Sequence, residues 1–376
     1  MRKLLSILFA LSLLSCGDGK TTPPQDEGDT LQLKYSSLLT IVRYDGYTVA
    51  TVSNPWKPGK TLHRYVLVPS DSTIHHPPST IHHPQSTLIR TPIRRSAVFT
   101  TVHCSLLTTL GVGESIVGVA DLKYIKIPYI QERVKSGHIA DCGNGLSPVV
   151  EKIMDLKPDA IMLSPFENSG GYGKVEELNI PLIECAEYME DSPLGRAEWM
   201  RFYGLLFGES ARADSLFAVV DSSYQALKAL AVKAGQGRSV LMDKMTGSVW
   251  YVPGGRSTIG QMVKDAGGRY PWAGDTHSGS LSLPFETVLE RGGESDVWLF
   301  RYSSDHPMSR RELLSEHRGY DHLKAFSSGE VYGCNVEQSL FYEESPFRPD
   351  WLLGDFIQIL HPGIEGLSPL RYFHKL

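Results

Sequence analysis

The sequence predicts an α/β protein in which two Rossmann-like lobes are joined by one long rigid helix, preceded by a small N-terminal antiparallel β unit. From residue 96 onward, short apolar runs alternate with helix-like segments, which is typical of a parallel sheet covered by helices. Residues 209–234 form one amphipathic stretch without Pro or Gly, and the alternation restarts after it. We therefore expect an N-terminal lobe over 96–208, a connecting helix over 209–234 and a C-terminal lobe over 235–376.

The first residues are typical of a secretory signal. Arg2 and Lys3 precede the apolar run Leu4–Leu14, which is too short to span a bilayer. The sequence Leu13-Leu14-Ser15-Cys16 resembles a bacterial lipobox, in which the cysteine is lipidated after cleavage. We expect a signal peptide over 1–15, lipidation of Cys16 and a flexible tether over 16–30, which would anchor the protein to a bacterial membrane on its periplasmic side. An ordinary signal peptide with a chance cysteine is the alternative.

Residues 31–95 are expected to form the β unit and a loop rich in His and Pro. Leu38–Tyr44 and Tyr47–Val52 are strand-like and flank Asp45-Gly46, which is a strong hairpin signal. A third strand-like run covers Leu62–Val68.

A tandem repeat then places four histidines, His75, His76, His82 and His83, within nine residues. Neutral imidazoles suit Zn, Ni and Cu, so one hypothesis is a metal-binding loop. The prolines stiffen the segment and oppose convergence of the four rings. The alternative is an exposed connecting loop.

The strands expected in the two lobes are short and apolar. In the N-terminal lobe they are Ala97–Val102, Ile116–Val119, His138–Cys142, Ala160–Leu163 and Pro181–Cys185; in the C-terminal lobe they are Ser239–Met242, Val249–Val252, Val297–Phe300 and Val331–Gly333. Helix-like segments lie between them, and an amphipathic helix over Asp350–Leu360 closes the chain.

Composition excludes several classes of function. The formal net charge is −5 and no basic block occurs, which argues against nucleic acid as a partner. The sequence contains no GxSxG, HExxH or Walker A motif, so nothing indicates an enzyme. Beyond Cys16, the cysteines are Cys104, Cys142, Cys185 and Cys334; they lack CxxC spacing and are expected as buried thiols, with one disulfide as the alternative.

Several segments resemble one protein family. Ser147–Glu151 with Leu156–Ile161 (SPVVE and LKPDAI), Ser192–Trp199 (SPLGRAEW) before the long helix, and Phe285-Glu286 with Glu294–Leu299 (ESDVWL) occur in the order found in periplasmic binding proteins for iron-siderophores, haem and vitamin B12. The resemblance covers about residues 96–362. The β unit and the His repeat depart from the simplest family members.

The resemblance implies a substrate-binding lipoprotein of an ABC importer. Such a protein captures an iron chelate (siderophore or haem) or a corrinoid between its lobes and delivers it to the permease transmembrane subunits. It is not an enzyme, and no permanent cofactor or protein-held metal follows. One exposed carboxylate on each lobe would dock onto permease arginines, and by motif position these would be Glu198 and Glu286.

Ligand contacts are expected from loops that follow the sheet strands. In the N-terminal lobe the candidates are Thr101, His103, Phe166 and Glu167; in the C-terminal lobe they are Trp250, Tyr251, Arg256, Arg301 and Tyr302. Aromatic rings suit a flat macrocycle, and arginines suit an anionic chelate. The remaining alternatives are a free Zn or Ni receptor that uses the His repeat, a surface enzyme on the same scaffold, and a non-catalytic adhesive lipoprotein.

Overall fold

The computed structural model describes residues 28–72, 86–167 and 171–376. The predicted signal peptide, the lipidation site Cys16 and the four histidines of the repeat lie outside the described residues. Within the described ranges, no helix is both long enough and apolar enough to cross a membrane.

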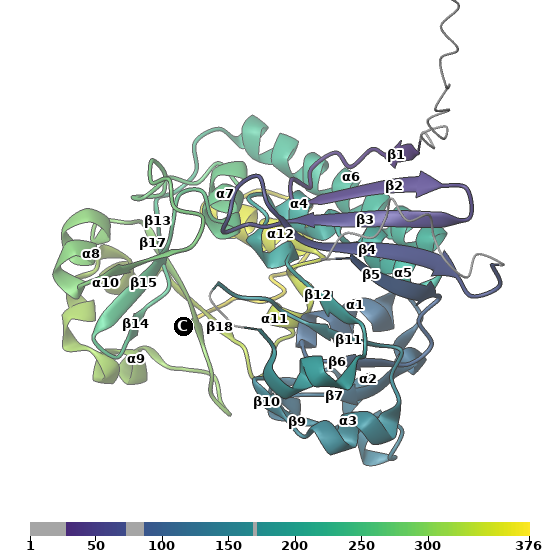
Figure 1. The fold of residues 1–376 in the computed structure, drawn as a ribbon. Coiled ribbons are helices and arrows are strands. Elements are labelled where there is room, and N and C mark those ends of the chain that lie inside the picture. Colours follow the sequence, from purple (N-terminus) through teal and green to yellow (C-terminus); the bar gives the residue numbers. More distant parts are fainter. Residues whose placement is uncertain (1–27, 73–85, 168–170) are drawn as a thin grey trace, which may run out of the picture.

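The N-terminal unit is a five-stranded sheet in the order β1-β2-β3-β4-β5. Its strands are β1 (Asp29–Leu31), β2 (Leu39–Tyr44), β3 (Tyr47–Ser53), β4 (Thr61–Pro69) and β5 (Ser86–Thr91). The predicted hairpin is confirmed, and Gly46 has the positive φ of 77° that its tight turn requires. β5 was not predicted; it pairs parallel to β4, and the sheet packs beside α5 (Figure 1).

This sheet is not a separate unit. Its inner side chains, including Ile41, Val52 and Ile89, belong to the same continuous core as the N-terminal lobe. The Tyr65 ring lies 5.7 Å from that of Phe202 on α5, centroid to centroid. The β unit therefore extends the core of the N-terminal lobe.

The N-terminal lobe is built on a parallel sheet, as predicted. The strand order is β12-β11-β6-β7-β8. Its strands are β6 (Ser96–Val98), β7 (Ile116–Val119), β8 (Ala140–Asp141), β11 (Ala160–Leu163) and β12 (Leu182–Glu184), with a small hairpin of β9 (Gly143–Asn144) and β10 (Ser147–Pro148). Its helices are α1 (Thr101–Thr109), α2 (Pro128–Lys135), α3 (Val150–Leu156), α4 (Pro193–Glu198) and α5 (Met200–Phe207). The central strands β6, β7 and β11 are buried on both faces, which explains their continuous apolar sequences.

The C-terminal lobe contains two sheets. The first has the order β13-β17-β18-β19, with β13 (Val240–Met242), β17 (Val297–Tyr302) and β18 (Val331–Asn335) parallel and β19 (His374–Lys375) antiparallel. The second is antiparallel and comprises β14 (Met245–Thr246), β15 (Val249–Pro253) and β16 (Ser280–Leu283). The predicted strand over Val249–Val252 therefore exists, but it belongs to this antiparallel sheet. The helices are α7 (Thr258–Asp265), α8 (Phe285–Gly292), α9 (Arg310–Glu316), α10 (Lys324–Ser328), α11 (Phe341–Glu344) and α12 (Pro349–Leu360).

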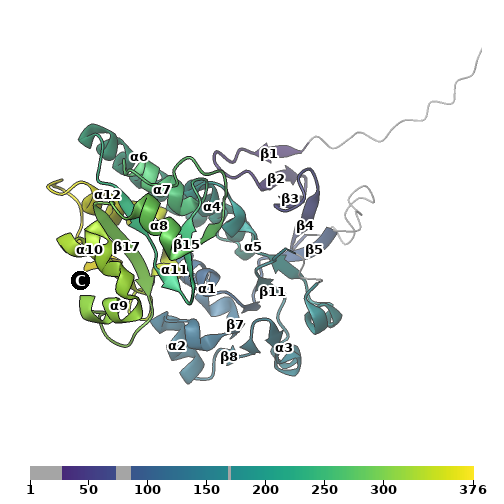
Figure 2. The same ribbon diagram turned by 90° about the vertical axis from the view of Figure 1, so that its left-hand side faces the viewer.

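The long helix α6 (Ser210–Ala234) has 25 residues and links the lobes, which confirms the predicted architecture. Figure 2 shows α6 along the top of the molecule, with α12 beneath it. The Tyr224 hydroxyl donates to Asp265 Oδ2 of α7 over 2.9 Å, and Lys228 Nζ lies 2.7 Å from Asp265 Oδ1. The helix is thus fastened to the C-terminal lobe along its second half.

Candidate functional site

The main candidate site is a cavity of about 600 Å³ at the carboxyl ends of β6, β7 and β11, which we call the N-lobe pocket. This is the edge of a parallel sheet at which ligands usually bind. The residues that line it are Phe99, Thr100, Asp121, Gly145, Leu146, Ser147, Pro148, Val150, Leu163, Ser164, Phe166, Gly171, Tyr172, Gly173, Lys174 and Val175. All of them belong to the N-terminal lobe.

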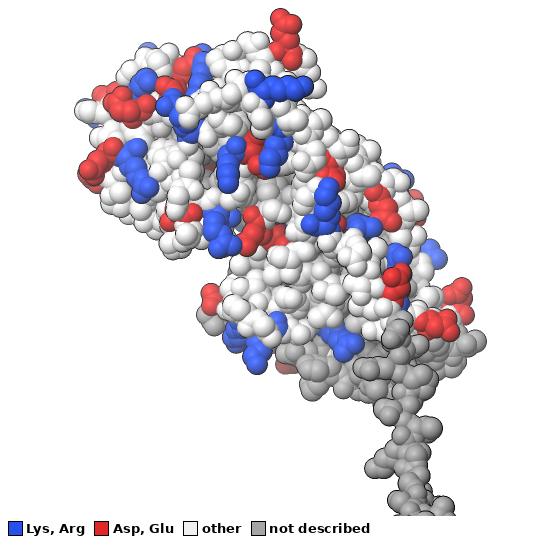
Figure 3. All heavy atoms as spheres, turned by 90° about the horizontal axis from the view of Figure 1, so that it is seen from above, with Lys and Arg blue, Asp and Glu red and all other residues white. Residues whose placement is uncertain are grey.

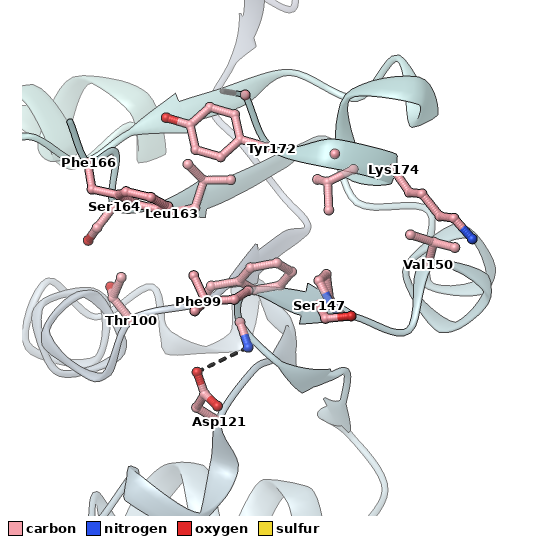
Figure 4. Close-up of a pocket in the computed structure, with 16 residues that line it drawn as sticks. Phe99, Thr100, Asp121, Ser147, Val150, Leu163, Ser164, Phe166, Tyr172 and Lys174 are labelled. Carbon is pink, nitrogen blue, oxygen red and sulfur yellow. Dashed lines mark hydrogen bonds between the residues drawn. The ribbon is translucent and has the colours of Figure 1, made fainter. Parts of the chain in front are cut away.

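The walls of the N-lobe pocket are mostly apolar and aromatic. Figure 4 shows Tyr172 and Leu163 on one side of the cavity and Phe99 and Ser147 on the other. The Tyr172 hydroxyl donates to Glu184 Oε1 over 2.7 Å, which fixes the ring in place. Such a surface suits the flat or aromatic body of a ligand.

Two charged residues border the same cavity. Asp121 Oδ2 accepts a hydrogen bond from the backbone N–H of Gly145 over 3.1 Å, so this carboxylate holds the loop between β9 and β10. Lys174 is exposed and makes no ion pair within the described part of the chain. Its ammonium group is available to an anionic ligand.

The four ligand residues that we predicted in the N-terminal lobe lie in different environments. Phe166 lines the pocket, and the adjacent Glu167 is exposed. The Thr101 hydroxyl instead donates to Glu343 Oε1 of the C-terminal lobe over 3.2 Å. His103 is only 1% exposed and lies in a buried polar network.

That network joins His103 to Glu187 and Tyr203. His103 Nε2 lies 2.9 Å from the Tyr203 hydroxyl, which donates to Glu187 Oε2 over 2.9 Å. Burial lowers the pKa of His103, but its interactions with Cys185 and Glu187 raise it more, to about 10. Burial raises the pKa of Glu187, but the positive charge of His103 lowers it more, to about 2. The pair is therefore a buried imidazolium–carboxylate ion pair, and His103 is not available to a ligand in the N-lobe pocket.

The same cluster has the donor types of a metal site. His103, Cys185 and Glu187 each place one potential ligand atom within 4.8 Å of the others, and all three are buried. The nitrogen and carboxylate oxygen that a metal would use are already engaged in the hydrogen bonds just described. In this arrangement His103 and Glu187 form an ion pair in the core.

Two of the predicted C-terminal ligand residues are wrong because they belong to the core. Trp250 is fully buried, and its indole N–H donates to the carbonyl of Met242 over 2.9 Å. Tyr302 is 5% exposed, and its hydroxyl is bonded to His374 Nε2 over 2.9 Å. Trp250 lies on the buried face of β15, opposite the exposed Tyr251, and Tyr302 lies in β17, which is buried on both faces, so neither side chain is free for a ligand.

The other three C-terminal candidates are accessible or lie between the lobes. Tyr251 is 44% exposed. Arg256 Nη2 lies 2.9 Å from Asp191 Oδ2, so it forms an exposed ion pair across the two lobes. Arg301 forms a two-point ion pair with Asp243 and lines a smaller cavity between the lobes.

The docking prediction needs one correction. Glu198 is fully buried, and its carboxylate accepts the backbone N–H groups of Lys34, Tyr35 and Ser36 at 2.8 to 2.9 Å. A carboxylate that is enclosed in this way cannot reach a permease. Glu286 is exposed in the first turn of α8.

The sequence analysis did not predict several of the residues that line the N-lobe pocket. Phe99 directly follows β6, so the rule that selected Phe166 could also have selected it. Tyr172 lies in the Gly-rich run over 170–173, a composition that is typical of a turn. All four remaining cysteines are free and buried, as the thiol interpretation predicted.

The comparisons agree with this architecture. The family model described as "Periplasmic binding protein" matches residues 97–337. An uncharacterized lipoprotein of Methanocaldococcus jannaschii is 24% identical over 372 residues, covering 94% of this chain and 87% of the relative. Among solved structures, a periplasmic heme binding protein of Pseudomonas aeruginosa has a TM-score of 0.58 at 14% identity, covering 75% of this chain and 98% of the other. The periplasmic vitamin B12 binding protein of Vibrio cholerae has a TM-score of 0.53 at 15% identity, covering 71% and 96%.

Proposed function

Because the chain belongs to the periplasmic binding protein family, we propose that it is the substrate-binding lipoprotein of an ABC importer and captures an iron chelate, haem or a corrinoid. The observation that supports this most directly is the N-lobe pocket, which combines aromatic walls with a volume of about 600 Å³. Pockets for organic ligands of moderate size fall in this range.

The chemistry of the lining favours recognition of a whole complex. Among the described residues that line the pocket there is no His, Cys or Met. A bare transition metal would lack the nitrogen and sulfur donors that it prefers. A metal already wrapped in an organic ligand needs only apolar contact and a few polar groups.

The contacts between the lobes favour a cleft that changes little on binding. Two contacts join the lobes: the carboxylate of Glu343 on α11 accepts a hydrogen bond from the Thr101 hydroxyl on α1, and Lys126 Nζ lies 2.6 Å from Glu337 Oε2. With α6 fastened to α7 as well, large hinge motion would break several contacts at once. We expect affinity to come from a largely preformed site.

Delivery to a permease requires accessible charges. Glu286 qualifies, and we assign Glu151 in place of the buried Glu198. Glu151 is exposed in the first turn of α3, which leads into β11, just as α8 leads into β17. In both helices the residue two positions later, Ile153 or Val288, is fully buried. The two glutamates thus occupy equivalent places in the two lobes, and α3 borders the pocket through Val150.

Binding is tested by titrating the intact protein with haemin, cobalamin and several ferric siderophores, followed by calorimetry and by absorbance of the complex. We expect one class to bind, and Phe99→Ala to weaken its binding about tenfold because the ring forms a wall of the pocket. Val219→Ala, an exposed apolar change on α6, is the matched control and should leave affinity unchanged. Binding of Zn or Ni alone, with no binding of any complex, would contradict the proposal.

A further inference from the structure

A second cavity lies between the two lobes and is separate from the N-lobe pocket. We call it the seam cavity; its volume is about 230 Å³. It is lined by Val102, Pro193, Arg196, Thr258, Ile259, Met262, Arg301, Phe341, Tyr342, Ser345, Pro346, Pro349 and Leu352. The first three come from the N-terminal lobe and the others from the C-terminal lobe.

The charges around the seam cavity are unbalanced. Two of the described residues that line the cavity are arginines, and no Asp or Glu is among those residues. Arg301 is already paired, because its Nε and Nη2 donate to the two carboxylate oxygens of Asp243 over 3.0 and 2.8 Å. Within residues 28–72, 86–167 and 171–376, Arg196 has no carboxylate partner in an ion pair.

The guanidinium of Arg196 is the unexplained group. Its Nε is buried without a hydrogen-bond partner, and no side-chain hydrogen bond of Arg196 is present within the described residues. The compensating charge is that of Glu187, which acts on Arg196 only through space and is itself paired with His103 and Tyr203. Burial lowers the pKa of Arg196, which reflects the same lack of solvation.

Arg196 is half-buried, and its Nε–H is enclosed away from water without an acceptor, which is costly. An adjoining cavity with no competing carboxylate offers space for the missing acceptor. A carboxylate could satisfy two N–H groups of Arg196 at once, because the fork of a guanidinium matches its two oxygens. Hydroxyl groups of Thr258, Tyr342 and Ser345 also border the space.

The other residues that line the seam cavity indicate what kind of group would be attached to the carboxylate. Ile259, Met262, Phe341 and Leu352 are apolar, so an inorganic anion would leave most of the cavity wall without matching contacts. The volume is well below that of the N-lobe pocket and accommodates one ring or a short hydrocarbon chain. We infer that the seam cavity binds the carboxylate of a small apolar organic acid through Arg196.

Such a carboxylate could come from two sources. It could be a free monocarboxylic acid that occupies the seam by itself, or a carboxylate arm of a larger complex captured by the protein. The second source rests on the proposed transport function, and the first does not. Both place the same group against Arg196.

The test uses benzoate as the probe and benzamide as its neutral counterpart, titrated calorimetrically into the intact protein. We expect benzoate to bind and benzamide to bind about tenfold more weakly. Arg196→Met should weaken benzoate about tenfold, because it keeps most of the volume and removes the charge. Arg256→Met is the matched control: it removes an arginine from the same pair of lobes that does not line the cavity, and benzoate affinity should not change.

Ile259→Trp is a second variant, which keeps the inference testable even if Arg196→Met does not fold. It fills the cavity and leaves the charge in place, so benzoate binding should again be lost. The inference would be overturned if benzoate failed to bind the unmodified protein, or if both cavity variants bound benzoate as tightly as the unmodified protein does. Because no metal complex enters these titrations, this failure is distinct from failure of the transport proposal.

Competition identifies the source of the carboxylate. If haemin, which has propionate arms, displaces benzoate and its dimethyl ester does not, the arm of a captured complex occupies the seam. If neither displaces benzoate, the seam takes a free acid. Both results support a carboxylate site.

Discussion

Two glutamates that the sequence assigned to the same task lie in opposite environments. Glu198 is the last residue of α4 and is fully buried, whereas Glu286 is in the first turn of α8 and exposed. The difference arises from a segment far away in the chain, because residues 34–36 fold over Glu198 and donate three backbone N–H groups to it. A motif therefore identifies the acid but not whether solvent or the protein surrounds it.

The buried glutamate does not act alone. Glu190 is 3% exposed and accepts hydrogen bonds from the backbone of Ser37 and Leu38 and from the indole N–H of Trp199. Together, Glu190 and Glu198 fasten the segment before β2 to the N-terminal lobe. On the face shown in Figure 3, by contrast, acidic and basic side chains are interspersed and exposed.

The largest effect should follow from removing the buried carboxylate. Glu198→Ala leaves three backbone N–H groups without their acceptor, so we expect unfolding free energy to fall by about 3 kcal/mol or more. Urea unfolding of the purified protein measures this. Glu286→Ala is the matched control and should change stability by less than about 0.5 kcal/mol. Equal stability of the two variants would break the comparison between the glutamates.

The exposed glutamates Glu151 and Glu286 should affect delivery of the ligand to the permease rather than stability. Replacing both Glu151 and Glu286 by Lys should reduce uptake by whole cells about tenfold or more, because like charges would face the permease arginines. Ligand affinity of the purified double variant should be unchanged, since neither residue lines the N-lobe pocket. Normal uptake at normal expression would show that other residues make the contact.

A smaller, pH-dependent effect should separate buried from exposed ion pairs. The pKa of His103 is raised from 6.5 to about 10, so its contribution to stability is complete below pH 6.5 and is lost as the pH rises toward 10. The pKa of Glu187 is lowered from 4.5 to about 2, so its contribution is complete above pH 4.5 and is lost as the pH falls toward 2. The pair therefore contributes fully between pH 4.5 and 6.5.

Thermal melts across pH 5 to 9.5 test this assignment. The Tm of the unmodified protein should fall with rising pH by more than that of His103→Gln, which has no titrating group at this site. His306→Gln is the control, because His306 is exposed beside Asp305 and Glu312 and its pair is screened by solvent. Parallel Tm profiles for His103→Gln and the unmodified protein would show that the buried pair does not titrate in this range.

The sequence by itself determined the architecture. The period of the apolar residues predicted β6, β7, β11, β13 and β17 as buried strands, and the unbroken run before Gly235 predicted α6. The hairpin of β2 and β3 followed from Asp45-Gly46. These features are local, because the backbone preferences and the side-chain period of one segment are enough to select its structure.

Only the tertiary structure decided the environment of individual side chains. Trp250 was selected by the same strand rule as Phe166, yet it is core because its face of β15 packs against Trp298 and Tyr320. Arg196 and Arg301 are 105 positions apart and meet at one cavity only because α4 of one lobe faces β17 and α11 of the other. Burial, pairing and cavity shape depend on residues that are distant in the chain, and no period or motif within a single segment encodes that proximity.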